Sequence, residues 1–353
     1  RSSMGQSVIP ISEALTSLQQ LDNCRFIPLV RRANTMGALD MGMAPGLLPG
    51  RNSLSSGSSA FSDIWPNLPS EPGANTKQIL QKAANGEIDT LFLLGADPIT
   101  DYPDKSIAKA ALQKVNTVIA VDLFVTPSVY ESDVALPAAS FLEANGSHTN
   151  VEGRITPIRQ KVTAPGTARP DWMIAAEISH RLGHDLGIDS PEDVWEEISS
   201  RSAVHEGLDY EQLAHNDNGH LITATGRIPF IPVTERVETR PVDSYAMRLI
   251  VGKRMFDQGT VTQMSPSLCS LAEQSQLRIN QYDFNRLGIQ EGTQVEVSSG
   301  GKSISISVKV DNRVPRSSAL IYTNLEGADP RELLSDDEHS IDIRIDPTVK
   351  GTA

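Results

Sequence analysis

A polar segment in the middle of the chain gathers side chains that commonly bind ligands. Residues 139–161 read ASFLEANGSHTNVEGRITPIRQK, which is too polar for a buried core segment. Amide, carboxylate and guanidinium groups lie close together in it, and such groups donate and accept the hydrogen bonds that orient a ligand. The alternative is a loop that only holds its own shape, with a turn and an internal ion pair. The residues concerned are Asn145, Gly146, Asn150, Glu152, Gly153 and Arg154.

Two other motifs resemble chemical sites but lack the context that such sites need. His180 and His184 have the spacing of zinc-binding helices, but no Glu follows His180 and Gly183 interrupts the helix. Residues 300–303, GGKS, resemble the end of a phosphate-binding loop but lie in an expected hairpin. The two cysteines cannot form a four-thiolate site. We therefore expect no catalytic residue and no metal site in this chain.

The first half of the chain alternates apolar strands with helices. Strands are expected over 90–98, 117–124 and 131–139, and helices over 76–89, 104–116 and 169–183. This order is typical of a parallel sheet that helices cover on both faces. We therefore predict a doubly wound α/β domain over residues 1–185, with a long irregular loop over 37–75.

The hydrophobic period changes in the last third of the chain. Residues 295–310 alternate around a Ser-Gly-Gly turn, which predicts a hairpin, and residues 281–289 predict a short helix between strands. We therefore expect a small closed β-barrel over residues 245–353. Residues 186–244 are predicted to be a helical and irregular connector, with a capped helix over 190–201.

The composition excludes several classes of partner. The chain has 44 acidic against 31 basic residues, a net charge of −13, and such a surface repels the phosphates of nucleic acids. No apolar run approaches the ~18 residues of a membrane-spanning helix, so we expect no direct membrane insertion. The chain starts at Arg1 without a signal peptide, and we expect it to be part of a longer protein.

Several motifs, in this order along the chain, resemble those of the molybdopterin oxidoreductase superfamily. They are the turn GADP at 95–98, the strand that ends in Asp122, the loop EANGSHTNVEGR at 143–154, and the stretch PGTARPDW at 165–172. The string INQYDFNRLGIQEGTQVEV at 279–297 resembles the last domain of this family, a double-psi β-barrel. The resemblance therefore implies an α/β domain followed by a double-psi barrel.

The resemblance also implies where a pterin dinucleotide would bind. A Gly turn lets the backbone approach a phosphate, and an Asp at a strand end accepts a hydrogen bond from a base edge or a ribose hydroxyl. Gly95, Asp97 and Asp122 match these positions, and the polar residues of 139–161 match the loop that closes over them. The barrel segment 255–260 departs from the family pattern, because it has no His and adds Asp257, which is unfavourable near a pyrophosphate. We therefore expect a retained fold with an emptied pocket and no molybdopterin in this segment.

Residues 31–51, RRANTMGALDMGMAPGLLPGR, indicate a branch of the superfamily. They resemble the large iron–sulfur subunit (the G subunit) of bacterial NADH-quinone oxidoreductase (respiratory complex I), in an actinobacterial-like form. This implies iron–sulfur clusters upstream of Arg1, other peripheral-arm subunits as partners, and a position at the cytoplasmic face of the plasma membrane. The segment would then support electron transfer from NADH to quinone. The alternative is the C-terminal part of a molybdenum enzyme such as a formate dehydrogenase.

Overall fold

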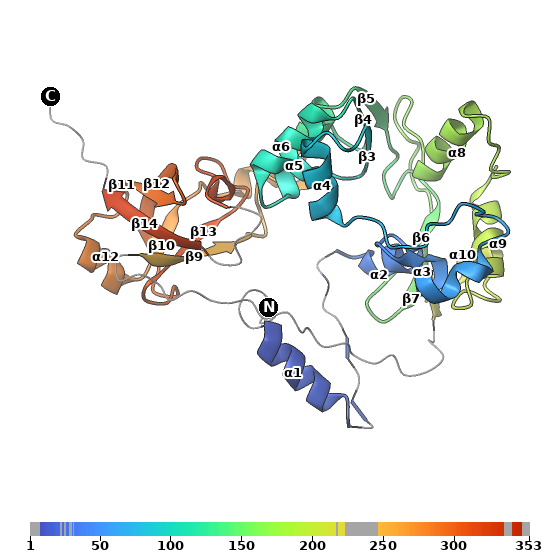
Figure 1. The fold of residues 1–353 in the computed structure, drawn as a ribbon, viewed down its shortest axis with the longest axis horizontal. Helices are drawn as coiled ribbons and strands as arrows, with labels where there is room; N and C mark the ends of the chain where they lie inside the picture. Colours follow the sequence, from blue (N-terminus) through green and yellow to red (C-terminus); the bar gives the residue numbers. More distant parts are fainter. Residues whose placement is uncertain are drawn as a thin grey trace.

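The computed structural model describes residues 8–21, 23, 24, 26, 27, 30, 32–216, 218–222, 246–334 and 341–347. Beyond the first helix, α1 (Val8–Leu18), these residues form a parallel sheet with helices, an antiparallel sheet with helices, and a closed barrel. Figure 1 shows the barrel at one end of the molecule, the parallel sheet in the middle and the antiparallel sheet at the other end.

The parallel sheet contains three strands in the order in which they occur in the chain. They are β3 (Thr90–Leu94), β4 (Thr117–Asp122) and β5 (Val134–Pro137). The helices are α4 (Thr76–Ala84), α5 (Pro98–Asp101), α6 (Lys105–Lys114) and α7 (Pro127–Tyr130). Leu80 of α4, Leu112 of α6 and Val129 of α7 share one core with the strands, so all three helices cover the same face. A capping box at Asn75 begins α4, and Gly86, in the left-handed conformation, follows its last turn.

The second face of this sheet differs from the expectation of helices on both sides. Phe92 and Leu94 point away from the core formed by their neighbours Leu91 and Leu93, and they are 47% and 45% exposed. Because alternate strand residues point to opposite faces, the apolar run supplies a second apolar face. Val121 of β4, which pairs with Leu94 on this face, is buried, so the described residues cover the second face only in part. The α/β class itself is confirmed.

The segment 37–75, which was predicted to be an irregular loop, contains several short elements. It contains most of α2 (Thr35–Asp40), then β1 (Leu47–Leu48), a 3₁₀ turn η1 (Pro49–Arg51), β2 (Asn52–Ser53), α3 (Leu54–Gly57) and η2 (Ser58–Ala60). Leu48, Leu54 and Phe61 form a small core of their own, and Phe61 stacks on Trp65 with ring centroids 5.2 Å apart. Elements of two to six residues are too short to produce a hydrophobic period.

The antiparallel sheet joins the polar hairpin to part of the predicted connector. It consists of β6 (Gly146–Thr149), β7 (Arg154–Ile158) and β8 (His220–Leu221), beside α8 (Asp171–Arg181), α9 (Pro191–Arg201) and α10 (Tyr210–His215). Ile155, Trp195 and Leu213 form its core. The first part of segment 186–244 therefore packs on β7 and is more than a connector. Residues 217 and 223–244 of that segment lie outside the described residues.

The last domain is a closed six-stranded barrel, as predicted. Its strand order is β10-β12-β11-β14-β9-β13. The strands are β9 (Met247–Gly252), β10 (Leu277–Ile279), β11 (Gln294–Ser299), β12 (Lys302–Val310), β13 (Ser318–Tyr322) and β14 (Ile341–Pro347). Its helical turns are α11 (Thr260–Gln263), η3 (Cys269–Leu271), α12 (Gln281–Leu287) and η4 (Pro330–Glu332). Inward-facing Ile and Val side chains fill the barrel, because residues alternate between its two faces.

Candidate functional site

The structure brings three of the predicted site residues together at the carboxyl edge of the parallel sheet. Gly95 follows β3 in the left-handed conformation, with φ 56°, and its N–H donates to Val121 O at 2.8 Å. Asp122 ends the neighbouring strand, and its carboxylate accepts a hydrogen bond from Leu123 N at 2.7 Å. Asp97 lies two residues beyond Gly95. This edge is where ligands commonly bind in α/β sheets.

Asp97 is a buried carboxylate that organises two turns. It begins α5, and its Oδ1 accepts hydrogen bonds from Thr100 N at 3.4 Å, Ser128 N at 3.2 Å and Ser128 Oγ at 2.5 Å. Its second oxygen, Oδ2, is buried and has no hydrogen-bond partner among the described residues. A buried carboxylate oxygen without a donor is unfavourable, and Oδ2 is the acceptor of Asp97 that no described residue satisfies.

Ser128 is a member of this site that the sequence reasoning did not identify. It is fully buried at the start of α7, and its hydroxyl accepts a hydrogen bond from Ile99 N at 3.1 Å while donating to Asp97. It therefore links the turn after β3 to the turn after β4. The sequence signal for it was Thr126 followed by Pro127, a capping residue and a first-turn proline, four residues after β4 ends.

A cavity of about 300 Å³ lies next to this edge and contains two more predicted residues. Asn145 and Gly146 line it together with Asp171 and Trp172. Burial, and secondly the negative charge of Asp122, raise the pKa of Asp171. The sequence motif contained Asp171 and Trp172, but neither was predicted as a site residue.

The other four predicted residues form the tip of the β6–β7 hairpin, away from this cavity. Gly146 and Asn150 are at opposite ends of β6, and four residues of strand span about 13 Å. At the tip, Asn150 Oδ1 accepts hydrogen bonds from Glu152 N at 2.9 Å and Arg154 N at 3.0 Å. Gly153 adopts φ 83° there.

The charged groups of the hairpin tip also have partners within the protein. Arg154 lies 3.4 Å from the Glu152 carboxylate and donates to Asn218 O at 3.3 Å. The polar residues of the hairpin therefore stabilise their own turn and bind it to the segment before β8.

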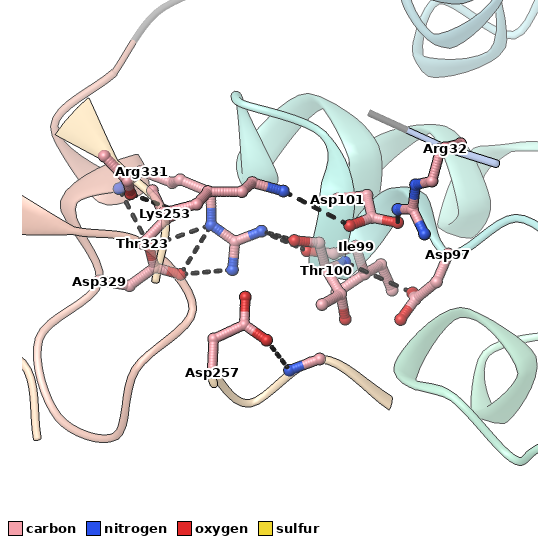
Figure 2. Close-up of polar contacts among 12 residues, drawn as sticks. Arg32, Asp97, Ile99, Thr100, Asp101, Lys253, Asp257, Thr323, Asp329 and Arg331 are labelled. Carbon is pink, nitrogen blue, oxygen red and sulfur yellow. Dashed lines mark hydrogen bonds and ion pairs between the residues drawn. The ribbon is translucent and has the colours of Figure 1, made fainter. Parts of the chain in front are cut away.

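The barrel contributes a loop that approaches the parallel sheet. Asp257 accepts a hydrogen bond from Gly259 N at 2.8 Å. Four residues earlier, Lys253 Nζ lies 3.8 Å from the Asp101 carboxylate of α5, and Figure 2 shows both residues. Asp257 therefore belongs to a barrel loop that begins at the contact with α5.

The electrostatics of this region favour hydrogen-bond donors over phosphates. Asp97 and Asp122 contribute carboxylates at the edge, and Asp171 contributes one at the cavity. Carboxylates accept hydrogen bonds from N–H and O–H groups, and they repel phosphate oxygens. Asp97 Oδ2 has no donor among the described residues, whereas Asn150 Oδ1 and the guanidinium of Arg154 at the hairpin tip already have partners within the chain.

The described residues contain neither a ready metal site nor a membrane span. No group of three or more His, Cys, Asp or Glu side chains in them is arranged to hold a metal ion. None of the helices in the same residues has the length and apolar character needed to cross a membrane.

Comparison with protein families divides the chain into two matched regions. Residues 13–181 match the family "Molybdopterin oxidoreductase", and residues 247–351 match the "Molydopterin dinucleotide binding domain". The second match coincides with the barrel. The chain is also similar in structure to acetylene hydratase from Pelobacter acetylenicus, with a TM-score of 0.62 and 16% identity over 78% of this chain and 47% of that one. This similarity supports the fold.

Curated relatives come from several oxidoreductases. A subunit of NADH-quinone oxidoreductase of Rhizobium meliloti, the one designated G 2, is 29% identical over 92% of this chain and 38% of its own length. The alpha subunit of NADPH-Fe(3+) oxidoreductase of Geobacter sulfurreducens is 28% identical over 92% and 37%. The alpha subunit of F420-dependent formate dehydrogenase 2 of Methanococcus maripaludis is 28% identical over 81% and 46%. The chain therefore spans less than half the length of these relatives.

Proposed function

Because this chain carries a molybdopterin oxidoreductase domain followed by a molybdopterin dinucleotide binding domain, we propose that it is the scaffold part of an electron-transfer subunit. The type is the large iron–sulfur subunit of an actinobacterial-like NADH-quinone oxidoreductase. In this proposal the segment supports a cluster-bearing region elsewhere in the subunit and contacts other peripheral-arm subunits at the cytoplasmic face of the membrane. Electrons pass from NADH to quinone through the clusters and not through this segment.

The observation that carries the proposal is the hydrogen bonding of the hairpin tip. Asn150 and Arg154 belong to the loop that the resemblance assigns to the pterin pocket, yet their polar groups bond to Glu152 and Asn218 of the same chain. A loop that binds a dinucleotide needs donors directed at the ligand. The carboxylates of Asp122 and Asp257 add charges that oppose phosphates. Both features favour a fold that is retained without its cofactor.

The experiment is metal analysis of the intact oxidoreductase purified from its own host. Molybdenum, tungsten and iron are measured by mass spectrometry per mole of this chain, with iron as the internal reference for cluster content. We expect iron without stoichiometric molybdenum or tungsten. One atom of either metal per chain would refute the scaffold proposal.

Two substitutions provide a second test in the same complex. Arg154→Gln and Asp122→Asn remove charges from the predicted pocket without removing buried apolar side chains. We expect NADH-quinone reductase activity, per assembled complex, to stay within about twofold of the wild type. A loss of more than tenfold with normal assembly would contradict an emptied pocket.

A second function is favoured by one specific observation. Asp97 Oδ2 is buried without a donor among the described residues. Asp171 lines the cavity, which Asp97 does not line, and burial raises the pKa of Asp171. Both groups suit a ligand that brings its own N–H donors. On this basis the chain would be the C-terminal part of a molybdenum enzyme such as a formate dehydrogenase. The metal measurement separates the two functions directly.

A further inference from the structure

The contact between the barrel and the helices of the parallel sheet includes a buried arginine. Arg331, in η4 of the barrel, is 7% exposed. Its Nη1 donates to the carbonyl oxygens of Ile99, at 3.3 Å, and Thr100, both in α5. Figure 2 shows its side chain extending from the barrel toward this turn. The two partners are separated from Arg331 by more than 200 positions in the sequence.

The helix α5 needs such a donor because of its length. It has a single turn, Pro98–Asp101, and the last four carbonyl groups of a helix have no partner within it. Pro98 O accepts from Tyr102 N, but Ile99 O and Thr100 O receive the guanidinium of Arg331. A cation at the carboxyl end of a helix also interacts favourably with its dipole.

The guanidinium is held in place from the barrel side. Asp329 accepts hydrogen bonds from Arg331 Nε at 3.0 Å and Nη2 at 2.6 Å, and it lies 3.7 Å from Lys105 Nζ at the start of α6. Burial alone would raise the pKa of Asp329, but the hydrogen bonds from Arg331 hold it below its ordinary value. Leu333, two residues after Arg331, is buried in the barrel core. The segment is therefore anchored in the barrel and contacts the other domain through two charged groups, Arg331 and Asp329.

The same turn is capped at its amino end by Asp97. Thus α5 is held at one end by a buried carboxylate of the candidate site and at the other by a buried guanidinium of the barrel. We propose that Arg331 is a positioning residue that holds α5, and through it Asp97, in place only while the barrel is docked on the α/β domain. The candidate site edge is then a joint property of both domains.

Hydrogen exchange of the full chain, read by mass spectrometry at single-residue resolution, tests this inference. Arg331→Ala is compared with Arg313→Ala, a control that removes an arginine of the same barrel whose side chain is 79% exposed and paired with Asp311. With Arg331→Ala we expect exchange at the amides of Thr100 and Ser128 to be about 10-fold to 100-fold faster, the range for a lost charge-assisted hydrogen bond. The control should leave both amides unchanged.

The pattern over the rest of the chain separates positioning from general damage. The inference requires strands β11 and β12 of the barrel, and β3 and β4 of the sheet, to keep their protection in Arg331→Ala. Unchanged exchange at Thr100 and Ser128, or an equal rise over all four strands, overturns it. Should Arg331→Ala fail to fold, Asp329→Asn replaces it, because this change removes the charge that orients the guanidinium. Faster exchange at the two amides in that variant supports the inference, and unchanged exchange refutes it.

Discussion

The contribution of Asp97 to stability can be worked out from its three hydrogen bonds. Replacing Asp97 by Ala removes the cap of α5, a loss of about 1 kcal/mol. It also leaves the buried N–H and hydroxyl of Ser128 without their acceptor, at roughly 1–3 kcal/mol for each unsatisfied group. Removal of the unpartnered Oδ2 offsets part of this loss, because a buried oxygen without a donor is itself unfavourable. We expect Asp97→Ala to lower the free energy of unfolding by about 2–4 kcal/mol.

The substitution Asp97→Asn distinguishes the contributions of the two carboxylate oxygens to stability. The amide keeps an acceptor for Thr100 and Ser128 and replaces the unpartnered oxygen by an uncharged NH₂ group. We expect the free energy of unfolding of this variant to lie within about 1 kcal/mol of the wild-type value. The measurement is urea unfolding followed by circular dichroism, with the denaturant slope required to stay constant so that midpoints report stability.

A matched control measures how much a helix cap alone contributes to stability. Asp209 begins α10 on the surface, and its carboxylate accepts one backbone hydrogen bond, from Gln212 N at 2.6 Å. Asp209→Ala should therefore lower stability by about 1 kcal/mol. The reasoning is refuted when Asp97→Ala is no more destabilising than Asp209→Ala, or when Asp97→Asn destabilises as much as Asp97→Ala.

Three further predictions concern groups outside this network. Arg278 is 5% exposed and lies between the carboxylates of Glu273 and Asp311. Arg278→Ala should therefore lower the free energy of unfolding in urea by about 3–5 kcal/mol, whereas Arg313→Ala, at an exposed arginine, should lower it by under ~1 kcal/mol. Equal losses in the two variants would contradict this prediction. Burial raises the pKa of Asp171, so the folded state keeps its proton to higher pH than the unfolded state and loses stability as pH rises above the ordinary carboxyl value. Asp171→Asn should therefore raise Tm at pH ~7 and leave it unchanged below pH ~3.5, whereas a gain independent of pH would refute the assignment. Gly219 has φ 68°, and an added Cβ would lie 2.3 Å from a backbone oxygen, so Gly219→Ala should lower the free energy of unfolding by roughly 2 kcal/mol or more. Gly300 has φ 55° but open space around it, so Gly300→Ala should lower it by only about 1 kcal/mol. Similar losses in the two variants would count against the clash at Gly219.

Local sequence patterns predicted the elements around the site because their causes are local. The apolar runs of β3 and β4, the cap of α9 at Ser190 and the Gly-Gly hairpin of the barrel each depend on residues within a few positions. The family resemblance assigned Gly95, Asp97 and Asp122 to one pocket, and the structure places them at one edge because parallel strands end together there.

The hairpin residues have partners that lie far away in the sequence. Asn145 and Asn150 are close in sequence and were assigned to one loop, but β6 runs between them and sends them to different surroundings. Whether a polar group binds a ligand or a neighbouring carbonyl depends on which segment lies opposite. For Arg154 that segment contains Asn218, 64 positions away. Sequence spacing carries no information about such a pair.

The sequence by itself determined the two domains, their order and the residue types at the sheet edge, since periodicity and capping are read over a few residues. Only the tertiary structure decided that Phe92 stays exposed, that Asp171 shares a cavity with Asn145, and that Arg331 completes a turn of the other domain. The physical reason is that a buried charge or carbonyl must find a partner wherever packing supplies one. Packing brings together Thr100 and Arg331, which are 231 positions apart, and no local pattern links them.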